Sequence, residues 1–192
     1  MISWPVLLDK MKDCSLCSLC EGRRRIVLGE GDYFARLMLV GEGPGAQEDR
    51  LGRPFVGPAG QLLDKMLAAI GLSREQVYIA NIVKCRPPGN RAPTDEEAAA
   101  CLPYLRSQVA LIQPALIVCL GATAARHIID PQLRITRDRG VWVQRKNYFI
   151  LPTYHPAALL RDAGKKREAW EDFKAIRDKL AQLEQEGGRY GQ

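Results

Sequence analysis

The chain has 192 residues and a formal net charge of +6, from 28 basic and 22 acidic side chains, and 46% of its residues are hydrophobic. This length suits one domain spanning residues 1–192 with a sizeable core. No apolar run approaches the roughly 18 residues of a membrane span, and no secretion signal follows the first Met, so the cytoplasm is the expected location. The basic balance is compatible with an anionic partner but does not by itself indicate one.

Four short apolar runs have the pattern of strands in a parallel sheet. They cover residues 37–40, 77–80, 116–120 and 148–151. They are almost continuously apolar, as expected of strands that helices cover on both faces. Longer amphipathic stretches separate them. The pattern predicts a single-domain three-layer α/β/α fold with a central, mainly parallel four-stranded sheet.

Amphipathic helices are expected between and after these strands. They are predicted at 61–70, from Thr94 to about 112, at 122–129 and at about 166–183. Thr94 and Glu97 have the spacing of a capping box. The last helix carries a stripe expected to pack on the core: Trp170, Phe173, Ile176, Leu180 and Leu183. From about Gly187 a frayed tail is expected.

Polar side chains directly follow three of the four predicted strands. Glu42 lies in the glycine-rich segment 41–45, Asn81 ends the second strand, and His155 follows the fourth. Only Gly121 follows the third. Because ligands bind beyond the carboxyl ends of parallel strands, we expect Glu42, Asn81 and His155 to converge at one edge of the sheet.

Six cysteines in a cytosolic chain indicate metal or redox chemistry rather than disulfides. The candidate ligands are the C-x2-C pair Cys14 and Cys17, followed by Cys85 and Cys101. Four thiolates suit either Zn²⁺ or a [4Fe–4S] cluster, and the spacing does not distinguish them. Cys119, inside an apolar strand, is expected to be a free core thiol. Cys20 is either a spare ligand or a buried thiol.

Several motifs follow one another between Cys14 and about Arg161. They are the segment 41–45 followed by Glu48-Asp49, then 52–57, 81–88, 90–93 and 155–157. In this order and spacing the chain resembles the family 4 uracil-DNA glycosylases, the iron–sulfur branch of their superfamily. The resemblance implies an enzyme that flips uracil out of DNA and hydrolyses its N-glycosidic bond. No lysine is placed to form a Schiff base, so we expect a monofunctional glycosylase that leaves an intact abasic strand.

The resemblance also implies the metal group and its ligands. The cluster cysteines of the family correspond to Cys14, Cys17, Cys85 and Cys101, which favours a [4Fe–4S] cluster over zinc. Cys20 is then the extra thiol, because the Cys14–Cys17 pair keeps the family's distance to the arginine run 23–25. A cluster core of charge +2 with four thiolates carries −2, so the loaded protein would have a net charge of about +4.

Three residues are expected to handle the base itself. Phe55, in a Gly/Pro-rich loop, would stack on the flipped uracil. The Asn81 amide can accept from uracil N3–H and donate to O4, a pattern that cytosine does not match. His155 would donate to O2 and stabilise the negative charge of the departing uracil. His127, the only other histidine, is expected to be structural.

The residue that activates water is less clear. Other branches of the superfamily carry Asp or Asn at the third position of the first motif, whereas here that substrate-facing position is Gly43. Glu42 or Glu48 could position the water or stabilise the oxocarbenium ion. Glu48 could instead block the C5 position and exclude thymine. The sequence leaves these roles open.

Phosphate contacts are expected from basic residues in two regions. The candidates are Arg86, Arg91, Arg161, Lys165 and Lys166. The segment from Leu159 to Arg167 has the composition of a minor-groove loop, in which a long or apolar side chain fills the gap that uracil leaves. The expected partner is double- or single-stranded DNA containing uracil, bound by a monomer.

Three other functions stay open from the sequence. A relative that captures uracil DNA covalently has a His-containing basic insertion after the second strand. Residues 87–100 contain no His, which argues against this alternative. A non-catalytic, zinc-structured DNA-binding module would be colourless. A small-molecule α/β enzyme would have no salt-sensitive affinity for DNA.

Overall fold

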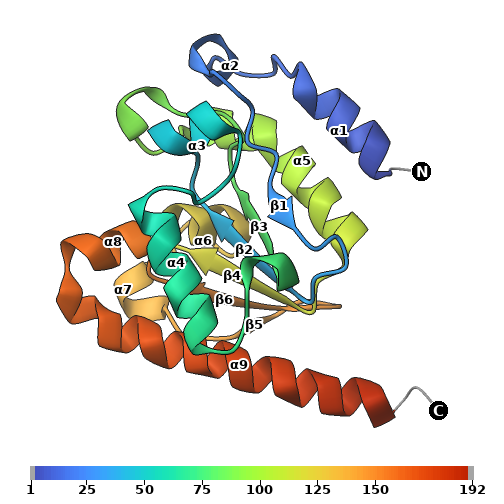
Figure 1. Ribbon diagram of the computed structural model, residues 1–192, viewed down its shortest axis with the longest axis vertical. Coiled ribbons are helices and arrows are strands. Elements are labelled where there is room, and N and C mark those ends of the chain that lie inside the picture. Colours follow the sequence, from blue (N-terminus) through green and yellow to red (C-terminus); the bar gives the residue numbers. More distant parts are fainter. Residues whose placement is uncertain (1–2, 190–192) are drawn as a thin grey trace.

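A parallel sheet between two helical layers organises the chain (Figure 1). The computed structural model describes residues 3–189. Its central strands run parallel in the order β3 (Tyr78–Asn81), β2 (Leu37–Gly41), β4 (Leu116–Leu120) and β6 (Phe149–Thr153). These are the four predicted strands. Their bounds differ from the predicted ones by at most two residues.

The predicted number of strands is wrong, because the described residues form a six-stranded sheet. β1 (Glu30–Gly31) pairs antiparallel with β3 at one edge, and β5 (Val143–Gln144) pairs antiparallel with β6 at the other. A strand of two residues has no alternation that a sequence pattern can reveal. Its pairing comes from the neighbouring strand and not from local preference.

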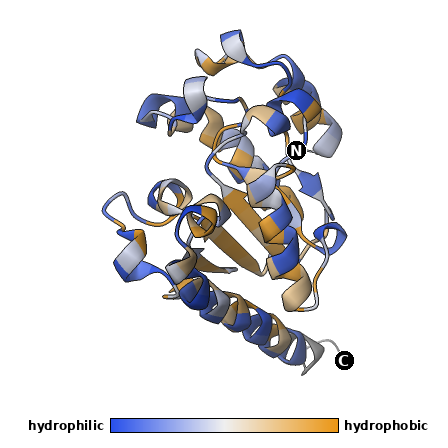
Figure 2. Ribbon diagram, turned by 60° about the vertical axis from the view of Figure 1, so that its left-hand side comes forward, coloured by the Kyte–Doolittle hydropathy of each residue, from blue (hydrophilic) through white to orange (hydrophobic). Residues whose placement is uncertain are grey.

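The predicted three-layer architecture is confirmed. On one face of the sheet, Met38 and Val40 pack with α5 (Asp95–Ile112) and α6 (Ala122–Ile128). On the other face, Leu37 and Leu39 pack with α4 (Pro58–Ala69) and α9 (Lys166–Arg189). Figure 2 shows the apolar strands enclosed between these helices. Burial of both faces accounts for the nearly continuous apolar runs.

Helix ends follow their sequence signals well. The capping box before α5 is present, since Thr94 Oγ1 accepts from Glu97 N–H at 3.2 Å and Glu97 Oε2 accepts from Thr94 N–H at 2.8 Å. α9 continues to Arg189, past Gly187 where fraying was expected, and residues 190–192 of that predicted tail lie outside the described part.

The apolar stripe predicted on α9 is only partly confirmed. Phe173 and Ile176 are buried as predicted, but Trp170 is 37% exposed and lies off the core.

Several short helices were not predicted. They are α1 (Trp4–Lys12), α2 (Leu19–Gly22), α3 (Ala46–Leu51), α7 (Ile135–Asp138), α8 (Pro156–Arg161) and the 3-10 turns η1 (Arg74–Gln76), η2 (Pro88–Asn90) and η3 (Ala163–Lys165). α1 lies along α5, and Tyr104 Oη donates to the Lys10 carbonyl at 3.3 Å (Figure 1). No helix in the described range is both long and apolar enough to cross a membrane.

A buried carboxylate fastens α9 to the sheet. Asp172 is 2% exposed and accepts from Thr153 Oγ1 at 2.5 Å and from Arg139 Nε at 2.8 Å. Thr153 is the last residue of β6, two positions before His155. Asp172 therefore couples the packing of the last helix to the strand end that carries His155.

We expect Asp172→Ala to lower the free energy of unfolding by about 3 kcal/mol, because it leaves the Arg139 guanidinium without its buried partner. Urea unfolding followed by circular dichroism measures this. The control is Asp178→Ala, which removes an exposed pair with Arg177 and should change stability little. Equal losses in the two variants would contradict this anchoring role.

Candidate active site

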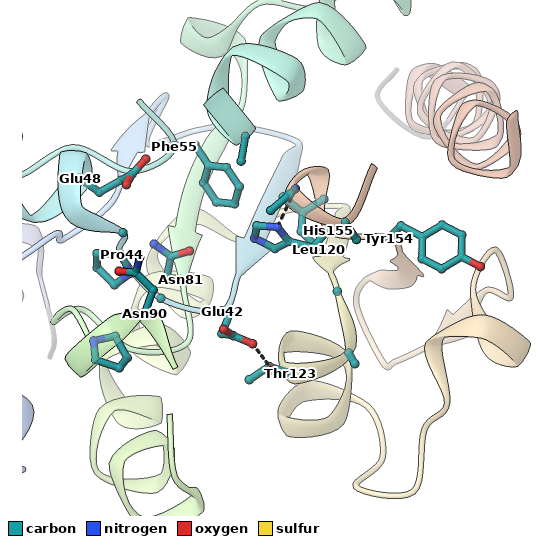
Figure 3. A pocket seen from close by; sticks show the side chains of 18 of the residues that line it. Glu42, Pro44, Glu48, Phe55, Asn81, Asn90, Leu120, Thr123, Tyr154 and His155 are labelled. Carbon is teal, nitrogen blue, oxygen red and sulfur yellow. Dashed lines mark hydrogen bonds between the residues drawn. The ribbon is translucent and has the colours of Figure 1, made fainter. Parts of the chain in front are cut away.

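A cavity of about 500 Å³ opens at the carboxyl ends of the four parallel strands (Figure 3). This volume lies within the range of roughly 300–1,000 Å³ that is usual for small-molecule sites. Glu42, Asn81, Gly121 and His155, one from the end of each parallel strand, all line it. The predicted convergence of these strand ends is therefore observed.

Phe55 reaches the cavity from the loop between α3 and α4. Its backbone is left-handed, with φ at 52°, and its side chain is 6% exposed. A Cβ on Gly41 would lie 2.6 Å from Phe55 Cζ and 2.5 Å from Asn81 Oδ1. Only a glycine at position 41 lets the ring and the amide come together there. The Phe55 ring also stacks on the His155 ring, with centroids 5.5 Å apart.

Glu48 lines the cavity from α3, but its carboxylate is engaged by the main chain. The N–H groups of Val56 and Gly57 both donate to Oε1 at 2.9 Å. These two residues directly follow Phe55. Glu48 therefore holds the loop that presents the Phe55 ring.

Asn81 ends β3 and has an unsatisfied acceptor. The residue is 1% exposed, and its buried Oδ1 atom has no hydrogen-bond partner among residues 3–189. An unpaired buried acceptor costs about 1–3 kcal/mol. The fold tolerates that cost in the wall of a cavity, where a ligand N–H group can satisfy the oxygen.

His155 forms the cavity wall opposite Asn81 and is arranged as a neutral hydrogen-bond donor (Figure 3). Its Nδ1 accepts from Ala157 N–H at 3.1 Å, so the hydrogen of the neutral ring resides on Nε2. The pKa of His155 is lowered to about 4, chiefly by burial and in smaller part by the nearby Arg161, while Glu48 opposes the shift. At neutral pH the ring therefore offers an Nε2–H donor without a charge.

Glu42 is held by a residue that sequence reasoning missed. Thr123 Oγ1 donates a hydrogen bond to Glu42 Oε2 (Figure 3). Thr123 lies in the first turn of α6, two residues after Gly121, and this hydroxyl just beyond a strand end was the available signal. Gly43 also lines the cavity, and a Cβ there would approach Val83 Cγ2 to 2.8 Å.

The five predicted DNA-contacting residues do not form one group. Arg91 and Arg161 line the cavity, and Arg91 pairs with Glu97 through an Nη2–Oε1 distance of 2.7 Å. Arg86 donates to Asn90 Oδ1 at 2.8 Å beside the cavity. Of the two lysines, Lys165 pairs with Asp162 and Lys166 is exposed at the start of α9. Neither lysine lines the cavity.

The predicted minor-groove loop after His155 is wrong as a description of local structure. Pro156–Arg161 forms α8, with Leu159 buried and Leu160 49% exposed. His155 caps this helix and Pro156 occupies its first position, where proline is favoured because its missing N–H needs no partner. That Pro signal was present in the sequence and outweighs the loop-like composition.

Five cysteines line a second, smaller pocket between the N-terminal segment, the loop after β3 and α5. They are Cys14, Cys17, Cys20, Cys85 and Cys101. Burial raises the pKa of Cys101 to about 11 and also raises the pKa of Cys85. Cys119 lies apart, fully buried in β4 as predicted. Within residues 3–189, no group of three or more His, Cys, Asp or Glu side chains is arranged to hold a single metal ion.

Two cations border this cysteine pocket. Arg23 Nη1 donates to Cys85 Sγ at 3.4 Å and to the Cys14 carbonyl at 2.6 Å. Lys84 is 1% exposed, and its Nζ donates to the Asn81 carbonyl at 2.9 Å and to Gln108 Oε1 at 2.7 Å. Neither acceptor of Lys84 is charged. The surroundings of the thiols therefore suit an anionic group.

Comparison with known proteins agrees with this site. The family model of the uracil DNA glycosylase superfamily matches residues 28–174. The chain is 47% identical to a type-4 uracil-DNA glycosylase of Thermotoga maritima, covering 82% of this chain and 83% of the relative. It is 45% identical to that of Sulfurisphaera tokodaii, covering 89% and 84% of the two chains. A third relative, the type-4 uracil-DNA glycosylase of Archaeoglobus fulgidus, is 43% identical over 88% of this chain and 89% of its own.

The three-layer fold and the cavity at its strand ends are thus those of the uracil-DNA glycosylase superfamily, to which the chain belongs. Identity above 40% over nearly the whole length of the three relatives places it more narrowly. It is a member of the type-4 uracil-DNA glycosylase family.

We expect His155 to be neutral, with its hydrogen on Nε2, at every pH above about 5, because its pKa of about 4 lies well below the usual value near 6.5. Two-bond ¹⁵N–¹H NMR spectra of the side chains identify the tautomer. The signals that the His127→Gln variant retains belong to His155, so this variant assigns the spectra of the two histidines. Because His155 does not change its charge near pH 6.5, the rate of uracil excision plotted against pH should show no transition there. A titration midpoint near 6.5, or a hydrogen on Nδ1, would refute the assignment.

Proposed function

We propose that the cavity receives a uracil flipped out of DNA and that Phe55, Asn81 and His155 bind it. As a type-4 uracil-DNA glycosylase, the chain hydrolyses the N-glycosidic bond of uracil in DNA and leaves an abasic site, without a lyase step. The unpaired Oδ1 of Asn81 beside the Phe55 ring is the observation that most directly supports this role for the cavity.

Asn81 reads the base through its amide. Its buried Oδ1 accepts from uracil N3–H, and its Nδ2 donates to O4. Cytosine has an acceptor at N3 and a donor at C4, so both contacts would be mismatched. Phe55 stacks on the ring and offsets part of the few kcal/mol that unstacking the nucleotide costs.

His155 stabilises the leaving group. Cleavage of the bond leaves negative charge on uracil, and a donor from His155 Nε2–H to O2 stabilises that charge as it develops. The bond from Ala157 N–H fixes the ring and its tautomer before substrate arrives. A preorganised donor of this kind lowers the barrier by roughly 2.7–4 kcal/mol.

Glu42 is the better candidate for positioning the attacking water. Glu48 Oε1 is already occupied by two main-chain N–H groups, which assigns Glu48 to holding the Phe55 loop. Glu42 uses Oε2 for Thr123 and, within the described residues, has no hydrogen bond at Oε1. The negative charge of the Glu42 carboxylate would also stabilise the positive charge that develops on the sugar.

DNA is held at the rim of the cavity. Arg91 and Arg161 are exposed there and would contact phosphates next to the flipped nucleotide, with Arg86 close by. Lys165 and Lys166 would meet the backbone farther along, beyond α8. The proposed partner is uracil-containing DNA, double- or single-stranded, bound by a monomer.

The cysteine pocket fits a [4Fe–4S] cluster. The pocket is lined by five cysteines, and cysteine thiolates are the usual ligands of such a cluster. Arg23 and Lys84 would offset the charge of −2 on the ligated cluster. The expected ligands are Cys14, Cys17, Cys85 and Cys101. The cluster would cross-link the N-terminal segment to the loop after β3 and to α5.

Protein purified without oxygen should be brown and contain iron and acid-labile sulfide at roughly four each per chain. Alanine at Cys14, Cys17, Cys85 or Cys101 should remove the colour and most of the iron. Cys20→Ala and Cys119→Ala are the matched controls and should keep both. Stoichiometric zinc without sulfide would contradict the cluster.

We expect Asn81→Asp to lower the single-turnover rate of uracil excision at least tenfold. An ionised Asp keeps an acceptor for N3–H but loses the donor to O4, and an unpaired buried acceptor costs about 1–3 kcal/mol. A uracil-containing oligonucleotide, followed by alkaline cleavage of abasic sites, measures the rate. Excision at the parent rate by correctly folded Asn81→Asp protein would show that Asn81 does not read the base.

A further inference from the structure

Arg74 binds the main chain of the Phe55 loop without lining the cavity. Its Nη1 donates to the Phe55 carbonyl at 2.8 Å, and its Nη2 donates to the Pro54 carbonyl at 2.6 Å. The Arg74 side chain is 14% exposed. Two consecutive carbonyl groups of the stacking loop are therefore held by one rigid cation.

The guanidinium is itself fixed by carboxylates from two other elements. Glu30 of β1 accepts from Nη2 at 2.9 Å, and Asp64 of α4 accepts from Nη1 at 2.9 Å. A planar guanidinium has five donors in a fixed fork, whereas a lysine ammonium has three at a single point. Arg74 can thus connect four acceptors at once, and a lysine in its place would lose part of that set.

The Phe55 backbone needs this support because it is strained. A φ of 52° puts a non-glycine residue in the left-handed region, which costs roughly 1–2 kcal/mol. α4 packs directly on the same peptide, since a Cβ on Gly60 would lie 1.7 Å from the Phe55 carbonyl oxygen. With Glu48 holding the next two N–H groups and Arg74 holding the carbonyls, the surroundings fully determine the loop.

We propose that Arg74 is a positioning residue for base recognition, which clamps the carbonyls of Pro54 and Phe55 so that the Phe55 ring is in its stacking position before DNA binds. This role rests on the proposed stacking of Phe55 on uracil. Strained conformations persist at functional sites when the surrounding structure enforces them. A ring already in place adds no ordering cost when the flipped base arrives.

The test is a double-mutant cycle on single-turnover excision with Arg74→Ala, Phe55→Ala and the combined variant. Arg74→Ala should slow excision roughly 10- to 100-fold, the scale of a loss caused by a small misplacement of a binding group. Because Arg74 acts through Phe55, the combined variant should be no slower than Phe55→Ala alone. Arg74→Lys should recover part of the rate. Arg53→Ala is the matched control, since Arg53 also pairs with Glu30 but has no hydrogen bond to the loop carbonyls.

A measurement independent of activity follows the ring itself. With fluorophenylalanine incorporated, the four Phe residues give ¹⁹F signals, and the Phe55→Leu variant assigns one of them. Arg74→Ala and Arg74→Lys should shift or broaden the Phe55 signal, whereas Arg53→Ala should not. Arg74→Lys keeps the charge and so serves if Arg74→Ala fails to fold.

The outcomes separate this role from the proposed function. Excision by Phe55→Ala at the parent rate would refute the stacking role and the positioning role together. A slow Phe55→Ala with fully additive losses in the combined variant would overturn only the role of Arg74, as would an unchanged Phe55 signal in both Arg74 variants.

Discussion

The parallel register of β2 with β3 is the constraint on which the site depends. It places Gly41 beside Asn81 at the strand ends, and the absence of a side chain at Gly41 leaves room for both the Asn81 amide and the Phe55 ring. A larger residue at position 41 could be accommodated only if both groups moved. The pairing of two buried strands thus decides whether the Asn81 amide and the Phe55 ring, which we propose bind the base, can occupy the same place.

The segment from Asn81 to Cys85 joins the two functional regions of the molecule. Its first residue carries the unpaired acceptor in the cavity, and its last carries a thiol in the cysteine pocket. Between them, Lys84 turns back to hold the Asn81 carbonyl. A group bound by the cysteines would therefore brace the strand end that carries Asn81, although it lies outside the cavity.

The sequence predicted what depends on local pattern and failed where distant residues decide. Apolar runs predicted the four buried strands, and the capping box at Thr94 placed the start of α5 correctly. The edge strands were missed because pairing with a neighbour, and not composition, creates them. The same reason hid Thr123 and Arg74, whose partners lie 81 residues away in Glu42 and 19 residues away in Phe55. For Thr123 the sequence offers only the position of its hydroxyl just beyond a strand end, and for Arg74 it offers no signal of its partners.

Two glycines of the first motif differ in how freely they could change during evolution. A side chain at Gly41 would displace the Asn81 amide and the Phe55 ring, whereas one at Gly43 would clash with the Val83 side chain and make ordinary contacts with Pro87. A residue larger than glycine at position 43 can therefore be accommodated if Val83 is also replaced. A residue larger than glycine at position 41 would disrupt the site. A single short loop thus combines a position that is closed to any side chain with one that a smaller residue at position 83 would open.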